Sequence, residues 1–225
     1  MSELGSANRS NGAGVVPEPE FDIVGARADE YAASPTVVFS VRVREPGERE
    51  VYTIALTTRI LVDPTGRGYD EAARESLYDL FGPPETMVAS MQSLVWGQVA
   101  VLVPSFTGEV TFDVPIACTY DLEVATAKYF ASLPDGVAPL DFHFNGTIFY
   151  SGENDRLQIV HVPWSCTARY RMPVAIWRKA VAARFARTGW IRLHEETLDR
   201  LRHRQTERGA PSFDAVVADL LEESR

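Results

Sequence analysis

The side chains best suited to metal or redox chemistry, cysteine and histidine, occur singly along this chain. The cysteines are Cys118 and Cys166, and the histidines are His143, His161, His194 and His203. Zinc sites draw their Cys and His ligands in closely spaced pairs, and this sequence has no Cys-x-x-Cys, no His-Glu-x-x-His and no acidic calcium loop. We therefore expect no metal site, no cofactor and two free thiols.

Signatures of nucleophilic or phosphate chemistry are missing as well. The sequence has no Gly-x-Ser-x-Gly, no phosphate loop ending in Gly-Lys-Ser/Thr and no Gly-x-Gly-x-x-Gly. Asp121 and Glu123 share one face of an expected strand and would allow an acid/base pair. Solvent-facing carboxylates on an amphipathic strand are the simpler interpretation. The sequence therefore predicts a protein that is not an enzyme.

Positive charge is concentrated late in the chain. Residues 169–208 contain eleven Arg or Lys and four acidic residues, whereas the whole chain has a net charge of −9. Such a segment either binds a polyanion or a partner, or is neutralised by acidic surface of its own chain, which is the simpler interpretation. The candidate residues for binding a polyanion or a partner are Arg192, His194, Arg200 and Arg204.

The segment that carries these candidates resembles a ribbon-helix-helix DNA-binding module. It consists of the strand-like run 190–194, a helix that ends at Gly209 and one further helix. In that family a short strand pairs with its dimer mate and lies in the major groove. The resemblance implies that Trp190, Arg192 and His194 face outward, although a bulky Trp on the reading face departs from the family.

Most of the chain before this segment alternates apolar and polar residues with the period of two that is typical of strands. Strands are expected at 37–43, 52–62, 99–103, 110–114, 140–144 and 157–162. The turn residues at 45–48 predict that the first two of these strands pair as an antiparallel hairpin, and those at 151–154 predict a hairpin of the last two. We also favour a strand over a helix for residues 120–133.

Helical spacing appears in two regions. Residues 69–81 form a helix that Gly82 stops, and a short helix is expected at 85–94. A later helix begins at Pro173, closes at Gly189 and lines one face with apolar residues. The residues expected on that face are Val174, Trp177, Val181 and Phe185.

The chain then continues with a strand, two helices and an apolar face on the last of them. The strand is expected at 190–193, and the first helix at 195–208 with Gly209 as its cap. Ser212 caps the final helix. The residues that this helix is expected to bury are Phe213, Val216, Val217, Leu220 and Leu221.

The order of these elements defines an α+β fold, an antiparallel sheet or sandwich followed by a helical segment packed on one side. Residues 1–20 are expected to be a disordered tail, because they hold almost no core-forming side chains. Residues 21–168 form the β-rich domain, with a helical insertion near 69–94. Residues 169–225 form a basic helix-strand-helix-helix segment.

Two short segments resemble each other. Val114-Pro115-Ile116-Ala117-Cys118-Thr119 and Val162-Pro163-Trp164-Ser165-Cys166-Thr167 share Val, Pro, Cys and Thr at matching positions. Either the match is chance, or the segments are equivalent strand ends of a duplicated sheet. Only the second interpretation would bring the two thiols together, and the sequence leaves this open.

Composition and hydropathy bound the class of protein. No run of 18 apolar residues occurs and the N-terminal residues lack the pattern of a signal peptide, so we expect a cytoplasmic protein without a membrane partner. The chain is rich in aromatic residues, which either line a peptide-binding groove or pack in the core, and core packing is the simpler role for most of them. They are Trp96, Trp164, Trp177, Trp190, Tyr129, Phe130, Phe149 and Tyr150.

Several runs resemble an actinobacterial family of unknown function whose genes lie among those for nickel-iron hydrogenases. They are Cys118–Val124, Lys128-Tyr129-Phe130, Phe144–Tyr150, Val162-Pro163-Trp164 and Trp177-Arg178. This resemblance implies an accessory role with a hydrogenase subunit or maturation factor as partner, and it supplies no catalytic residues. A more distant resemblance, through alternating strands followed by Gly-Thr-Ile-Phe, is to the SecB export chaperone, whose sheet offers apolar grooves to unfolded clients.

Two functions are therefore expected, from different classes. The first is a non-enzymatic protein-binding accessory factor for assembly or maturation of a nickel-iron hydrogenase. The alternative is a DNA-binding regulator that uses the C-terminal segment. The sequence does not define the oligomeric state.

Overall fold

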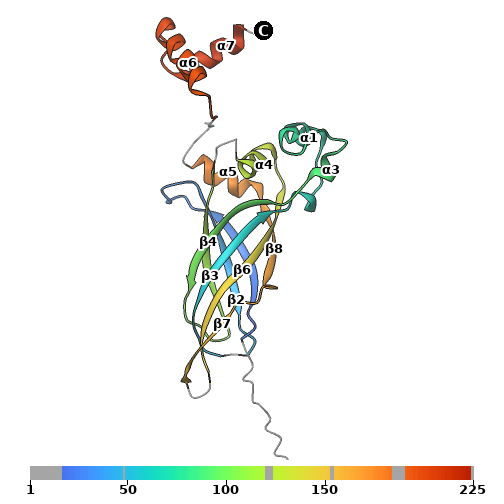
Figure 1. Ribbon diagram of the computed structural model, residues 1–225, viewed down its shortest axis with the longest axis vertical. Coiled ribbons are helices and arrows are strands. Elements are labelled where there is room, and N and C mark those ends of the chain that lie inside the picture. The colour runs from blue at the N-terminus through green and yellow to red at the C-terminus, as the bar shows by residue number, and fades with distance from the viewer. Residues whose placement is uncertain (1–16, 48, 120–123, 153–154, 184–190, 224–225) are drawn as a thin grey trace, which may run out of the picture. The chain divides into compact units, whose positions relative to one another are not determined.

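The structure is a computed structural model that describes residues 17–47, 49–119, 124–152, 155–183 and 191–223 (Figure 1). The chain divides into two compact units, Met1–Thr188 and Gly189–Arg225, which we call the sandwich unit and the C-terminal unit. Each is described by itself. Together their elements confirm the α+β class, because two antiparallel sheets are followed by helices.

The sandwich unit is built from two antiparallel sheets. One has the order β1-β2-β5, and the other has the order β4-β3-β6, with β7 and β8 both paired with the far edge of β6. The strands are β1 (Glu20–Ala28), β2 (Thr36–Arg44), β3 (Val51–Val62), β4 (Leu94–Val103), β5 (Glu109–Ala117), β6 (Val137–Ser151), β7 (Leu157–His161) and β8 (Thr167–Pro173). The inner faces of the two sheets enclose one apolar core.

The expected hairpin between 37–43 and 52–62 is wrong, although both segments are strands. β2 pairs with β1 and β5, whereas β3 pairs with β4 and β6. Phe39 and Val41 on β2 and Ile54 and Leu56 on β3 are all buried in the same core. The loop after β2 therefore crosses from one sheet to the other. The edge of β2 that was expected to pair with β3 pairs with β1, a strand that the sequence analysis does not predict.

The second expected hairpin is confirmed. β6 pairs with β7 in an antiparallel register that places Ser151 opposite Leu157 and Thr147 opposite His161. Gly146 lies within β6 where the neighbouring backbone of β3 comes close. A Cβ atom at this position would lie 2.2 Å from the Ala55 carbonyl oxygen, so the strand pairing requires glycine there.

The expected strand at 120–133 is wrong over the part that the structure describes. Residues 125–132 form helix α4 (Ala125–Ser132), while 120–123, and with them Asp121 and Glu123, lie outside the described residues. The adjacent residues Tyr129 and Phe130 are both fully buried, which a strand with two opposite faces against one core does not allow.

The helices of the sandwich unit gather at one end of the sheets (Figure 1). They are the 3₁₀ turn η1 (Pro64–Gly66), α1 (Glu71–Ser76), α2 (Tyr78–Phe81), α3 (Met87–Ser90), α4 and α5 (Val174–Ala182). The ring of Phe130 stacks on that of Trp177 with centroids 5.4 Å apart and lies 4.9 Å from that of Trp96. These aromatic rings close the core at this end, as core packing predicts.

Several expected helix limits shift. Residues 69–81 contain two helices, because α1 ends at Ser76 and α2 begins at Tyr78. The helix expected at 85–94 is limited to α3, and Leu94 already belongs to β4. α5 begins after Pro173 and buries Val174 and Trp177, as expected, whereas its expected end at Gly189 lies outside the described residues.

Both expected boundaries of the β-rich domain also differ from the structure. The expected division at 168/169 cuts through β8, which pairs with β6, and it separates α5 from the sheets that α5 covers. The chain divides instead between Thr188 and Gly189. At the other end, Pro17 and Pro19 are buried and β1 begins at Glu20, so the fold starts before residue 21, while residues 1–16 lie outside the described residues.

The described part of the C-terminal unit is a pair of helices, α6 (Glu195–Arg208) and α7 (Phe213–Glu223). Gly209 ends α6 in the left-handed conformation, and the Ser212 hydroxyl accepts a hydrogen bond from the Ala215 N–H at 3.2 Å, as the capping pattern predicts. Residues 191–194 form no strand within the described chain, and Trp190 lies outside it.

The expected burial by the last helix is largely wrong. Val216 is buried, but Phe213 and Leu221 are exposed, and Val217 and Leu220 are only half-buried. The reason is that a two-helix hairpin offers one partner helix and no second layer.

No helix in the described ranges is both long enough and apolar enough to cross a membrane.

Candidate functional site

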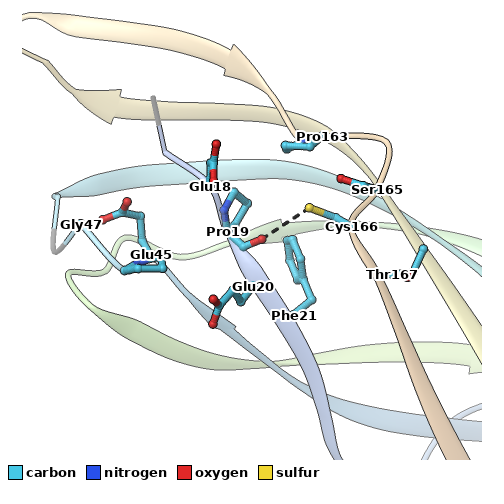
Figure 2. Close-up of a pocket in the computed structure, with 11 residues that line it drawn as sticks. Glu18, Pro19, Glu20, Phe21, Glu45, Gly47, Pro163, Ser165, Cys166 and Thr167 are labelled. Carbon is cyan, nitrogen blue, oxygen red and sulfur yellow. Dashed lines mark hydrogen bonds between the residues drawn. The ribbon is translucent and has the colours of Figure 1, made fainter. Parts of the chain in front are cut away.

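One hollow in the sandwich unit lies where the start of β1 meets the β7–β8 turn (Figure 2). It has a volume of about 560 Å³ and is open to solvent on one side. Its lining residues are Glu18, Pro19, Glu20, Phe21, Glu45, Pro46, Gly47, Pro163, Ser165, Cys166 and Thr167. The ring of Phe21, one of these lining residues, stacks on that of Phe144 with centroids 4.3 Å apart.

The one sulfur atom in this hollow is a thiol of low reactivity. The Cys166 thiol donates to the Pro19 carbonyl oxygen at 3.4 Å, as Figure 2 shows. Burial, followed by the negative charge of Glu18, raises the pKa of Cys166. Because the thiolate is the nucleophilic form, a raised pKa leaves little of it at neutral pH. The chemistry of this group therefore does not support a cysteine nucleophile.

Two of the three carboxylates that line the hollow, Glu45 and Glu20, have structural partners. Glu45 is buried, and its Oε2 accepts the Arg49 N–H at 2.8 Å, which fixes the loop between β2 and β3. Glu20 pairs with Arg44 across the β1–β2 ladder. Through these contacts Glu45 belongs to the loop and Glu20 to the strand edge, whereas Glu18 is exposed at the hollow.

The cysteine and histidine side chains considered as metal ligands do not lie close together in the described residues. Within the described ranges no three His, Cys, Asp or Glu side chains gather as a metal site would need. Cys118 follows the last residue of β5, which pairs with Thr36, the first residue of β2. Cys166 contacts Pro19, which precedes the residue that pairs with Arg44, the last residue of β2. The two thiols thus lie at opposite ends of the three-stranded sheet, and burial raises the pKa of Cys118 to about 12. His143 is exposed, as predicted for the outer face of its strand.

The four candidate residues of the basic segment lie on or before α6. Arg192, His194 and Arg200 are exposed, whereas Arg204 is half-buried and pairs with Glu223 of α7 at 3.0 Å. Arg208 pairs with Asp219 at 3.4 Å and also with Glu223. The count of charges over residues 169–208 ended before α7, whose acidic residues pair with Arg204 and Arg208 of α6.

The outer face of the larger sheet carries an apolar area that the sequence did not indicate. Strand register places Leu102 beside Ala55, and Phe149 between Thr53 and Ile159. Leu102 is 75% exposed, Ile159 60% and Leu157 58%. We call this area the outer patch, and its residues are Ala55, Ala100, Leu102, Phe149, Leu157 and Ile159.

The outer patch is bounded by polar residues on the same face. Its rows are completed by Thr53, Thr57, Asn145, Thr147, Ser151 and His161, and none of these is an acidic residue, a lysine or an arginine. The next row toward the helices contains Gln98, Arg59 and His143. Large exposed apolar patches with a polar rim occur at interaction sites for proteins, membranes or ligands. The alternating pattern of each strand was visible in the sequence, but the patch depends on four strands lying in register.

The described elements define an antiparallel two-sheet sandwich followed by C-terminal helices. The chain belongs to the family of unknown function DUF6084, whose pattern matches residues 16–225. The match confirms that the chain belongs to a family of unknown function and carries no link to actinobacteria or to hydrogenase genes. No curated protein matches the chain.

Solved structures share only a general likeness with this chain. AT1g01470 from Arabidopsis thaliana has 8% identity and a TM-score of 0.37, covering 86% of this chain and 95% of that one. A putative late embryogenesis abundant protein has 12% identity and a TM-score of 0.31, covering 70% and 72%. The putative ApaA protein from Bordetella pertussis has 14% identity and a TM-score of 0.23, covering 70% and 96%. Similarities at this level support no functional inference.

Proposed function

We propose that this chain is a non-enzymatic, protein-binding accessory factor of the cytoplasm, and that its partner binds the outer patch. The observation that carries this proposal is the exposure of Leu102, Leu157 and Ile159 on one face of the larger sheet. Burying such side chains against a partner gains about 25 cal/mol per Å² of apolar surface. The β-strand positions hold these side chains in fixed directions, which favours a defined partner over a loose one.

The resemblance to a family whose genes lie among those for nickel-iron hydrogenases suggests the identity of the protein that binds the outer patch. We propose a hydrogenase subunit or a maturation factor. A partly assembled subunit still exposes apolar surface, and an accessory factor with a matching face would cover it until assembly is complete.

The test is affinity capture of the full chain from the organism that encodes it, with matched variants. Wild type should recover a defined hydrogenase component. Leu102→Glu, which places a charge in the outer patch, should lose it, whereas Gln98→Glu, on the same strand and face but outside the patch, should retain it. Recovery of the chain as an inert monomer, or equal capture by both variants, would refute the proposal.

The alternative proposal, a DNA-binding regulator, is supported by the exposure of Arg192, His194 and Arg200. It is weakened by the ion pairs that engage Arg204 and Arg208 with α7. A gel shift at several salt concentrations distinguishes the two proposals, because phosphate contacts make affinity fall steeply with salt. We expect no shift that behaves in this way.

A further inference from the structure

Strand β7 leaves one edge of the larger sheet open. It pairs with β6 on one side and, in the described part of the chain, with no strand on the other. Two hydrogen bonds that flank β7 fix its ladder with β6. The Val162 N–H donates to the Gly146 carbonyl oxygen at 2.9 Å. At the other end the Gly152 N–H donates to the Arg156 carbonyl oxygen at 2.8 Å.

The backbone groups on the open edge belong to three residues of β7. Hydrogen-bonded and non-hydrogen-bonded pairs alternate along an antiparallel ladder, so Gln158 and Val160 are bonded to β6. Leu157, Ile159 and His161 therefore direct their N–H and C=O groups away from β6. No backbone hydrogen bond of these three residues to another segment occurs within the described chain.

The other edge strands of the sandwich unit carry features that hinder the addition of a further strand. Charged residues, prolines and bulges protect the edges of natural sheets. β1 and β8 contain charged residues, β5 contains Pro115, and β4 shifts its register opposite Ile60. Residues 157–161 contain no acidic residue, lysine, arginine or proline, and their register with β6 has no shift. The edge of β7 is therefore open to pairing.

The outer patch reaches this edge, and this determines what can cover it. Leu157 is 58% exposed and Ile159 60%, and both belong to the outer patch. A partner that buries these side chains also removes water from their outward N–H and C=O groups, which weakens binding unless those groups are paired. An extended segment offers donors and acceptors at the spacing of a strand, so it pairs these groups while it covers the side chains.

A second copy of this chain is a poorer occupant of the edge. Two β7 strands can pair in an antiparallel ladder, and the two-fold axis between them then keeps both outer faces on the same side. That arrangement would join two outer patches into one larger exposed patch and leave Leu102 and Phe149 of both copies uncovered. The partner that binds the outer patch is therefore the better source of the segment.

We propose that this partner adds an extended segment to the open edge of β7, antiparallel to β7, as a further strand of the larger sheet. The segment pairs with Leu157, Ile159 and His161 and has apolar side chains at alternate positions, on the face that it shares with Leu157 and Ile159. β7 has five residues, so a short segment is sufficient. This inference rests on the proposed function, because it concerns the same partner.

The first test measures amide exchange of the full chain by NMR, with a blocked heptapeptide of alternating valine and threonine as the probe. In the free chain the amides of Leu157, Ile159 and His161 should exchange quickly, whereas those of Gln158 and Val160 should be protected. Saturating peptide should slow exchange of the first three at least about tenfold. No slowing refutes the proposal. Protection that the free chain already shows would mean that another of its own segments covers the edge, and protection that grows with its concentration would mean a second copy. Both outcomes also refute the proposal.

Substitution at His161, which lies outside the outer patch, separates the edge from the patch. His161→Pro removes one outward N–H and leaves the bonds to β6 in place, and His161→Ala is the matched control that keeps this N–H. The heptapeptide should bind His161→Pro at least about tenfold more weakly than wild type and should bind His161→Ala equally well. Equal binding to both variants would contradict the pairing.

A change in the peptide keeps the test valid if His161→Pro disturbs β7, which faster exchange at Val160 would reveal. In the proposed antiparallel pairing the valine N–H groups of the heptapeptide donate to β7, and the threonine N–H groups point away. Methylation of the valine nitrogens should therefore abolish binding, whereas methylation of the threonine nitrogens should not. The opposite result, or no effect of either change, would contradict the proposal.

The heptapeptide also distinguishes failure of this inference from failure of the proposed function. Leu102→Glu lies on β4, which β3 and β6 separate from β7, so this variant should bind the heptapeptide like wild type. Binding of the heptapeptide without capture of any partner would refute the proposed function alone. Capture of the partner by both His161→Pro and His161→Ala would refute the added strand alone.

Discussion

At the scale of the residue, the clearest case of an uncompensated polar atom in the described core is Thr58. Its side chain is fully buried on β3, and its hydroxyl finds no hydrogen-bond partner among the described residues. Leaving such a group without a partner costs about 1–3 kcal/mol, and valine has the same shape without the hydroxyl.

Thr58→Val should therefore raise the free energy of unfolding by about 1 kcal/mol, as measured by urea denaturation. Thr53→Val is the matched control on the same strand. The Thr53 hydroxyl donates to the Val103 carbonyl oxygen at 2.8 Å, so this variant should lose stability. Destabilisation by Thr58→Val would show that its hydroxyl has a partner after all.

The reactivity of Cys166 is the second prediction at this scale. Because burial and then Glu18 raise its pKa, its alkylation by iodoacetamide should be slower at pH 8 than in the unfolded chain and should rise as the pH rises. Glu18→Gln removes the negative charge, lowers this pKa and should increase the rate several-fold. Glu20→Gln, whose parent carboxylate pairs with Arg44, should leave it unchanged. Equal rates in all three proteins would contradict the assigned cause.

At the scale of the element, the contact between β6 and β3 depends on Gly146. A methyl group there would lie 2.2 Å from the Ala55 carbonyl oxygen, so the two strands must separate to accept it. Gly146→Ala should lower the free energy of unfolding by about 2 kcal/mol or more, which thermal and urea denaturation would measure.

Gly25 of β1 provides the control for that substitution. It also lies within a strand, but no atom lies within 4 Å of where its Cβ would be. Gly25→Ala should change stability by less than about 0.5 kcal/mol. Equal losses from both variants would show that strand glycines in general, and not the close approach at Gly146, limit stability.

The sequence predicts the positions of the strands better than it predicts which strands pair with each other. Alternation along 37–43, 52–62 and 140–144 identifies real strands, because each places one row of side chains in the core. Pairing is not local, so the turn residues at 45–48 could not show that β2 and β3 belong to different sheets. The same limit hid the outer patch, since Leu102 and Ile159 come together only through the register of two intervening strands.

At the C-terminus the sequence predicts the helix ends correctly, but it predicts the burial of the side chains incorrectly. Gly209 and Ser212 mark helix ends through contacts within a few residues, and both marks agree with the structure. The burial of Phe213 and Leu221 depends on what lies against the hairpin, which no local pattern specifies. The basic character assigned to residues 169–208 failed for the same reason, because the neutralising side chains come from α7.

At the scale of the whole molecule, the described residues form a sheet sandwich that displays the outer patch and a helical hairpin that exposes Phe213 and Leu221. Glu45 accepts a hydrogen bond from the Arg49 N–H, and burial raises the pKa of both Cys118 and Cys166. We interpret the chain as a scaffold that presents surfaces to other proteins.

The most direct measurement of this claim is site-specific photo-cross-linking in the native host. A benzophenone amino acid replaces Leu102 in one strain and Gln98 in another, so that two probes lie on the same face of β4, one inside the outer patch and one outside it. The account predicts a cross-link from position 102 to one defined protein and little or none from position 98. Equal cross-linking from both positions, or none from position 102, would contradict it.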